Sequence, residues 1–86
     1  MATRRVTIGS PTGLHARPAK LLTEAARNHP HPVRIGRDEA GLVDASSILA
    51  VMSLGVRAGE EVLLTTEGDH ADQTLAELAD LLADDS

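Results

Sequence analysis

The chain has 86 residues and a net charge of −5, and it contains neither cysteine nor any aromatic residue. Without cysteine it can form no disulfide, thiolate metal site or thiol nucleophile, and the missing aromatic rings and the negative charge argue against single-stranded and duplex nucleic acids as partners. Because the N-terminal segment has no long apolar run, we expect no signal peptide and no membrane anchor, and we expect a cytoplasmic protein.

The first half of the chain predicts a strand, a helix and two further short strands. In RRVTIGS, Val6 and Ile8 alternate with polar neighbours, which is typical of a half-buried strand. After the turn SPTG, residues 16 to about 28 predict a helix that ends at NHPHP, where two prolines prevent its continuation. Strands are expected over 32–36 and 42–45, separated by the turn RDEAG.

The second half predicts a short helix, a strand and a longer helix. The segment SSILAVMSLG begins with two serines that can cap a helix and ends at Gly55, which can terminate one. The segment EVLLTTEG predicts the fourth strand. In the last helix, Asp69 is the expected N-cap, and Leu75, Leu78 and Leu82 form a stripe at helical spacing.

The order of these elements is β-α-β-β-α-β-α, which predicts one α+β domain over residues 1–86. Four strands with one apolar face each need a cover, and helices packed on that face supply it. An antiparallel sheet whose other face meets solvent fits the alternating strands better than a doubly wound parallel sheet does.

A candidate site lies in GLHARPA, where His15 precedes the first predicted helix. The first turn of a helix has amides without an intrahelical partner, and Pro18 is tolerated there because it has no amide hydrogen. Together with the guanidinium of Arg17, these amides would form an anion site suited to phosphate. Two interpretations of His15 stay open on spacing alone. It is either a helix cap in an ordinary loop or a residue that receives a group and passes it on.

The charges are unevenly distributed along the chain. Residues 1–37 hold seven of the eight basic residues, and residues 38–86 hold twelve of the thirteen acidic ones. This division is either a chance arrangement of solvated faces or a basic patch near His15 that attracts acidic partners by electrostatic steering.

GLHARPA and SSILAVMSLG together resemble the HPr family, the histidine-containing phosphocarriers of the bacterial sugar phosphotransferase system. The resemblance covers essentially the whole chain. It implies an open-faced β-sandwich, in which a four-stranded antiparallel sheet is covered on one face by three helices. It also implies a carrier rather than an enzyme. His15 would accept a phosphoryl group on Nδ1 from phosphorylated enzyme I, ultimately from phosphoenolpyruvate, and donate it to the IIA domains of sugar permeases.

The resemblance assigns roles to further residues. Arg17 would stabilise the transferring phosphoryl group, and the phosphate would also be held by the amides of Ala16 and Arg17 and by Thr12. The expected partner contacts are Thr12, Lys20, Arg27, Leu49 and Met52.

Ser47 aligns with a serine that a dedicated kinase phosphorylates in some members, so a serine kinase or a transcriptional regulator is a further candidate partner. The alternative is that Ser46 and Ser47 only cap the short helix. His29, His31 and His70 have no acidic or thiol ligand pattern around them, so we interpret them as ordinary loop residues.

We therefore expect a monomer without metal or cofactor. Three alternatives remain for the function: a nitrogen-branch paralogue, a carrier for a dihydroxyacetone kinase system, and a small α+β binding module that is never phosphorylated. The sequence does not identify the sugars or permeases that the carrier would serve.

Overall fold

The strand β4 (Glu61–Thr66) is the centre of the fold in the computed structural model, which describes residues 1–84. It pairs antiparallel with β1 (Ala2–Thr7) on one side and with β2 (Arg34–Gly36) on the other, and β3 (Val43–Asp44) pairs with β2. The strand order is therefore β1-β4-β2-β3. Because β4 has a neighbour on both sides, all of its residues after the first are buried.

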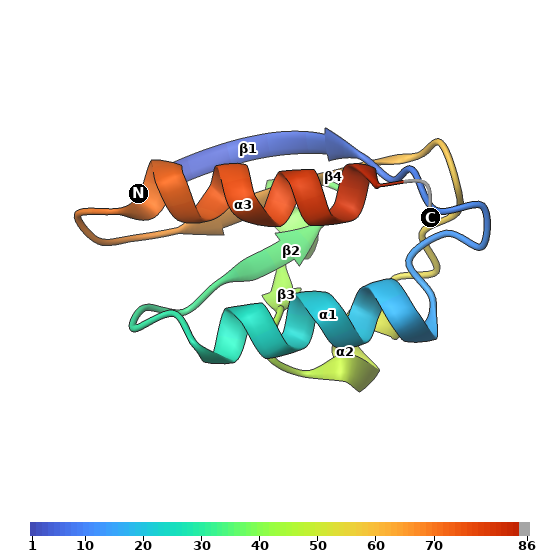
Figure 1. Cartoon of the computed structure of the whole chain (residues 1–86), viewed down its shortest axis with the longest axis horizontal. Coiled ribbons are helices and arrows are strands. Elements are labelled where there is room, and N and C mark those ends of the chain that lie inside the picture. Colours follow the sequence, from blue (N-terminus) through green and yellow to red (C-terminus); the bar gives the residue numbers. More distant parts are fainter. Residues whose placement is uncertain (85–86) are drawn as a thin grey trace.

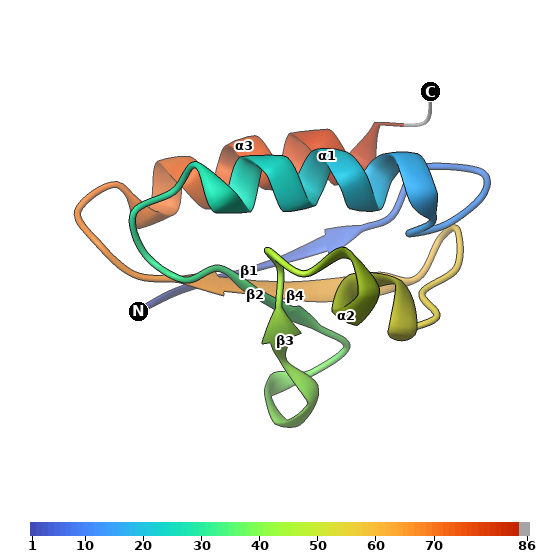
Figure 2. The same cartoon turned by 90° about the horizontal axis from the view of Figure 1, so that it is seen from below.

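Two long helices, α1 (Ala16–Arg27) and α3 (Ala71–Ala83), lie side by side over one face of this sheet (Figure 2). The short helix α2 (Ile48–Ser53) packs against α1 and β3. The predicted α+β fold with an open antiparallel sheet and three helices is confirmed. No helix among residues 1–84 is long and apolar enough to cross a membrane.

The core lies between the helices and the covered face of the sheet, and it is entirely aliphatic. Val62 and Leu64 of β4 are fully buried; Val62 registers with the buried Val6 of β1, and Leu64 registers with the buried Ile35 of β2. The predicted stripe of α3 is confirmed, because Leu75, Leu78 and Leu82 are each at most 2% exposed. Branched and straight aliphatic side chains pack densely in defined rotamers, so the core needs no ring.

The first strand begins and ends earlier than the alternation of Val6 and Ile8 predicts. It ends at Thr7, although Ile8 is buried. Ile8 leaves the regular ladder because it bonds to a loop: its amide donates to the Glu60 carbonyl (2.9 Å), and its own carbonyl accepts from the Gly59 amide (2.9 Å). The alternation of apolar and polar residues in the sequence reports which side chains are buried, and Ile8 is buried although it lies beyond the end of β1.

The prediction that Asp69 caps the last helix is wrong. The N-cap of α3 is His70. The chain turns at Gly68, which has φ +104°, and the Ala71 amide donates to the Gly68 carbonyl (3.2 Å). This turn includes Asp69 and delays the start of the helix by one residue. A second difference is a short 3-10 helix, η1 (Glu39–Gly41), within the segment expected to be a simple turn.

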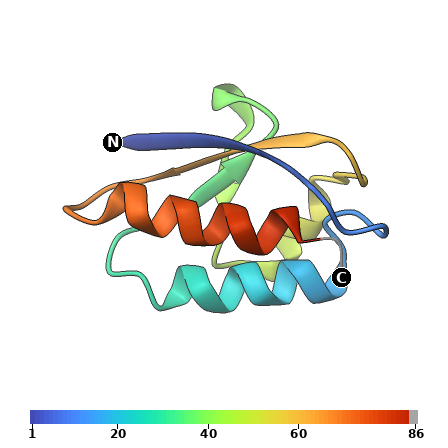
Figure 3. The ribbon, with the colours of Figure 1, turned by 45° about the horizontal axis from the view of Figure 1, so that its top comes forward.

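The two ends of the molecule carry different segments. In Figures 1 and 3, the turn before α1 and the loop between α2 and β4 lie at the same end, near the C-terminal end of α3. The chain's N-terminus and the turn between β4 and α3 lie at the other end. His15, the N-cap of α1, therefore lies at the end of the molecule that also carries the loop between α2 and β4.

Candidate functional site

His15 lies at the N-terminus of α1, where the backbone changes from extended to helical. It is the N-cap residue, and its carbonyl accepts a hydrogen bond from the Ala19 amide (2.8 Å). The residue is exposed and, among residues 1–84, its side chain makes no capping hydrogen bond. The amides of Ala16 and Arg17 also have no hydrogen-bond partner within the described chain, as is usual in a first helical turn. An accessible imidazole thus precedes two free amide donors.

The turn that carries His15 is built on the loop between α2 and β4. The Leu14 amide donates to the Val56 carbonyl (3.0 Å), and Leu14 itself is buried. Gly13 has φ +75°, in the left-handed region that favours glycine. The imidazole is exposed because the residue before it turns into the core and fixes the backbone.

We expect Gly13→Ala to destabilise the protein strongly. A Cβ at this position would lie 2.6 Å from the Val56 carbonyl oxygen and 2.9 Å from the Arg57 Cα. Both contacts are to backbone, which cannot rotate away. The left-handed conformation and the overpacking together should cost about 3 kcal/mol or more. Urea denaturation followed by far-ultraviolet circular dichroism measures this loss.

Gly59→Ala is the matched control for that change. Gly59 also has a positive φ (+83°), but a Cβ there would meet no atom of the described residues 1–84 within 4 Å. It should therefore lose only the conformational part, about 1–2 kcal/mol. Equal losses in the two variants would show that the contact between Gly13 and the loop is unimportant.

Two unpaired cations follow His15 along α1. The side chains of Arg17 and Lys20 are exposed and have no ion-pair or hydrogen-bond partner among residues 1–84. The first turn of α1 contains no acidic residue. By contrast, Arg4 and Arg5 lie in β1, on the sheet. Of these four basic residues, Arg17 and Lys20 therefore share the N-terminal half of α1 with His15, whereas Arg4 and Arg5 lie on another element.

The two serines before α2 have separate structural roles. The Ser47 hydroxyl caps the helix by accepting from the Ala50 amide (3.3 Å), as the sequence predicts. Ser46 donates its hydroxyl (2.7 Å) and its amide (2.9 Å) to Asp44 Oδ1, and its carbonyl accepts from Arg27 Nε (3.2 Å). These Ser46 hydrogen bonds hold the pKa of Asp44 below its usual value, and nearby arginines add to the effect. Phosphorylation of Ser47 stays a prediction.

Exposed apolar side chains are present on both α1 and α2. Leu49 is 80% exposed, and Met52 is half-buried. Leu21 is 45% exposed, and sequence reasoning missed it. The sequence contains a pattern that predicts this exposure. Leu22 and Ala26 are spaced four residues apart on the buried side of α1, and Leu21 lies outside that stripe. Exposed leucines on adjacent helices are suited to contact with a partner protein.

The other histidines are placed away from this site. His29 follows α1 and links it to the start of α3. Its Nε2 donates to the Glu67 carbonyl (3.3 Å), and its Nδ1 accepts from the hydroxyl of Thr74 in α3 (3.3 Å). The His31 ring lies 5.9 Å from the His29 ring. Across residues 1–84, no group of three or more His, Cys, Asp or Glu side chains could hold a metal ion. His29 is a structural residue in this loop cluster.

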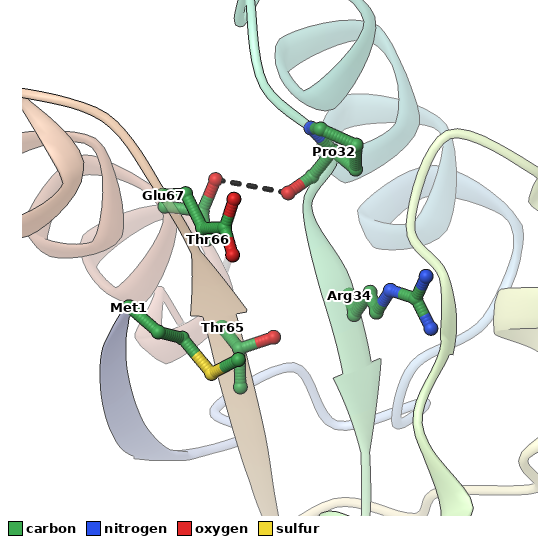
Figure 4. Close-up of a pocket in the computed structure, with 6 residues that line it drawn as sticks. All are labelled: Met1, Pro32, Arg34, Thr65, Thr66 and Glu67. Carbon is green, nitrogen blue, oxygen red and sulfur yellow. Dashed lines mark hydrogen bonds between the residues drawn. The ribbon is translucent and has the colours of Figure 1, made fainter.

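A small pocket of about 140 Å³ lies at the far end of β4 from His15 (Figure 4). Met1, Arg34 and Thr65 line it, together with Thr66, whose hydroxyl donates to the Pro32 carbonyl (3.0 Å). None of the residues predicted to act in function lines this pocket. A second hollow, of about 360 Å³, is lined by two of the predicted partner contacts, Lys20 and Arg27, together with Ile48 of α2. His15 itself lies on the exposed surface at the start of α1.

Comparison with known proteins assigns this chain to a class. The family described as "PTS HPr component phosphorylation site" matches residues 2–84, so the chain is of the phosphotransferase-system type. Curated relatives agree over nearly the full length. The phosphocarrier protein HPr of Streptomyces coelicolor is 43% identical over 84 residues, covering 98% of this chain and 90% of the relative. The chain belongs to the HPr family of phosphocarrier proteins.

Other relatives and solved structures support this assignment. The phosphocarrier protein HPr of Haloferax volcanii is 47% identical over 81 residues, covering 93% of this chain and 91% of the relative. An HPr structure from Thermoanaerobacter tengcongensis superposes with a TM-score of 0.85 at 36% identity, covering 95% of this chain and 91% of that one. An HPr dimer from the same organism has a TM-score of 0.67 at 39% identity and covers 80% of this chain and 78% of that one.

Proposed function

We propose that this protein accepts a phosphoryl group on His15 from phosphorylated enzyme I and donates it to the IIA domains of sugar permeases. The observation that carries the proposal is the exposed His15 at the start of α1. Next to it lie the amides of Ala16 and Arg17 and the Arg17 guanidinium, none of which has a partner among residues 1–84. The protein acts as one cytoplasmic domain over residues 1–86 and as a monomeric carrier, not as an enzyme.

The proposed chemistry needs few groups on this chain, because phosphoryl transfer depends mainly on positioning and on stabilisation of negative charge. A neutral ring nitrogen of His15 attacks the phosphorus, and the bond from phosphorus to the donor histidine breaks as the new P–N bond forms. Negative charge on the three equatorial oxygens then has to be stabilised. The amides of Ala16 and Arg17 and the guanidinium are donors suited to that charge. On His15, the family resemblance implies Nδ1 as the acceptor atom. In the second transfer the bond from phosphorus to His15 breaks as a new P–N bond forms to the histidine of the IIA domain.

The test has two stages. Incubation with phosphoenolpyruvate and an enzyme I should add one acid-labile phosphoryl group, seen by intact mass under neutral conditions. The isolated phosphoprotein, mixed with a IIA domain, should then lose that group as the IIA domain gains it. If a competent enzyme I transfers nothing, the protein is a binding module. If the first transfer occurs and several IIA domains accept nothing, the nitrogen-branch or dihydroxyacetone-kinase alternative takes precedence.

Lys20 should accelerate the encounter with an acidic partner. Its side chain is exposed on α1, one turn beyond Arg17, and has no ion-pair partner in the described part of the chain. We expect Lys20→Glu to lower the association rate with enzyme I about tenfold at low salt, with a smaller effect as salt screens the charge. Stopped-flow measurements over a salt series provide this rate.

Arg4→Glu is the control, because it makes the same change in net charge on the sheet. It should alter the rate much less than Lys20→Glu does. Equal effects of the two variants would mean that net charge steers the encounter and that Lys20 has no local role. Arg27 is a poorer test residue, since its guanidinium also donates to the Ser46 carbonyl.

A further inference from the structure

One arginine ties together the two ends of the loop between α2 and β4. From the segment after β2, Arg37 Nη1 donates to Glu60 Oε2 (2.8 Å), and Nη2 donates to the carbonyl oxygens of Leu54 (3.3 Å) and Gly55 (3.0 Å). The Glu60 carboxylate also accepts from the Arg57 amide (2.7 Å). We call this set of hydrogen bonds the Arg37 clasp.

The clasp is fully charged at neutral pH. Hydrogen bonding to Arg37 and to the Arg57 amide holds the pKa of Glu60 below its usual value, and the two positive charges add to this. The carboxylate raises the pKa of Arg37 in turn. A carboxyl whose pKa is lowered on folding stabilises the folded state above its unfolded pKa and ceases to do so as the pH falls through the folded value. Protonation therefore opens the clasp only in acid.

The clasped loop is also the support of the turn that carries His15. The Leu14 amide donates to the Val56 carbonyl (3.0 Å) within this loop. At the end of the loop, Ile8 exchanges two backbone hydrogen bonds with Gly59 and Glu60, each 2.9 Å long. The segment that leads into α1 is thus hydrogen-bonded to this loop at Ile8 and again at Leu14, the residue before His15.

We propose that Arg37 is a positioning residue for phosphoryl transfer, acting through the α2–β4 loop to hold the turn that places His15. This inference rests on the proposed function. The guanidinium is suited to the task because its planar array of donors can bind a carboxylate and two carbonyls at once, which a lysine ammonium does with less geometric control. The side chains of Arg37 and Glu60 are 45% and 39% exposed, and exposed pairs contribute little to stability. The main effect of the clasp is therefore on position.

The test compares Arg37→Ala with Arg37→Lys and with Arg57→Ala. Arg57→Ala removes a cation from the same loop but leaves the amide that bonds Glu60, so it is the matched control. We expect Arg37→Ala to lower the rate of phosphoryl transfer from enzyme I about tenfold at saturating carrier, with little change in affinity, since small displacements of reacting groups slow transfer. Arg37→Lys should restore part of the rate, and Arg57→Ala should leave it unchanged.

Amide hydrogen exchange separates positioning from a general loss of stability, and it needs no phosphorylation. In Arg37→Ala, exchange should accelerate at Leu14 and Ile8 while the core amides of α3 stay at the wild-type rate. Unchanged exchange at Leu14 would overturn the proposal, as would faster exchange at every amide. Faster exchange at Leu14 with an unchanged transfer rate would also overturn it. If the wild-type protein accepts no phosphate at all, the proposed function fails instead, and the exchange data still decide whether Arg37 holds the turn.

Discussion

Replacing His15 by alanine should abolish the acid-labile phosphorylation of this protein by enzyme I. His15 is an exposed N-cap residue whose ring is engaged in no capping bond among residues 1–84, so its loss should leave the fold intact while removing the acceptor nitrogen. Intact mass after incubation with phosphoenolpyruvate and enzyme I measures the result, and far-ultraviolet circular dichroism checks the fold.

The chain provides a close control for this experiment in His70. It is likewise the exposed N-cap of a long helix, without a side-chain capping bond in the described structure, and its carbonyl accepts from the Thr74 amide (2.9 Å). The first turn of α3 differs in containing Asp72, which disfavours a phosphate there. His70→Ala should therefore be phosphorylated like the wild type. If the phosphate persisted in His15→Ala and disappeared in His70→Ala, the acceptor would be His70 at the start of α3, and the assignment of His15 would be wrong.

Arg17→Ala should slow transfer from enzyme I by about 10²–10³-fold, the usual loss when one donor to a developing negative charge is removed. The guanidinium has no other partner among residues 1–84, so its removal should cost the fold little. Arg17→Lys should recover only part of the rate, because an ammonium lacks the two-pronged geometry that matches a phosphoryl group. Rapid-quench measurements of the single transfer step test both variants.

The control for Arg17 is Arg5→Ala, which removes an exposed arginine from β1. Its transfer rate should stay at the wild-type level. A reduction below threefold in Arg17→Ala would mean that the amides of the first turn suffice to stabilise the phosphoryl group. Equal reductions in the two variants would instead point to net charge as the cause.

Most of the fold could be predicted because local pattern and burial agree. The Leu75, Leu78 and Leu82 stripe, the Ser47 cap and Gly55 at the end of α2 are each specified by a few neighbouring residues, and each is found where expected. The start of α1 at Ala16, with His15 as its N-cap, is also found where expected, because it depends on residues adjacent in sequence. Phosphate binding at this helix start stays a prediction.

The features that the sequence did not reveal depend on contacts between distant segments. Ile8 is buried beyond its strand because Gly59 and Glu60 bond to it from another loop. The Arg37 clasp joins Arg37 to residues 17 to 23 positions further along the chain. The sequence around Arg37 and around Glu60 contains no local pattern that predicts this contact. Asp69 was a reasonable cap by composition, but the turn at Gly68 determines where α3 begins.

The aliphatic core has a practical consequence for studying the relay. With neither tryptophan nor tyrosine in the chain, the protein has no intrinsic fluorescence and almost no near-ultraviolet absorbance. Any tryptophan emission from a mixture therefore comes from the other protein. Binding of a proposed partner that contains tryptophan can therefore be followed through the partner's own emission, without a label and without background from this chain.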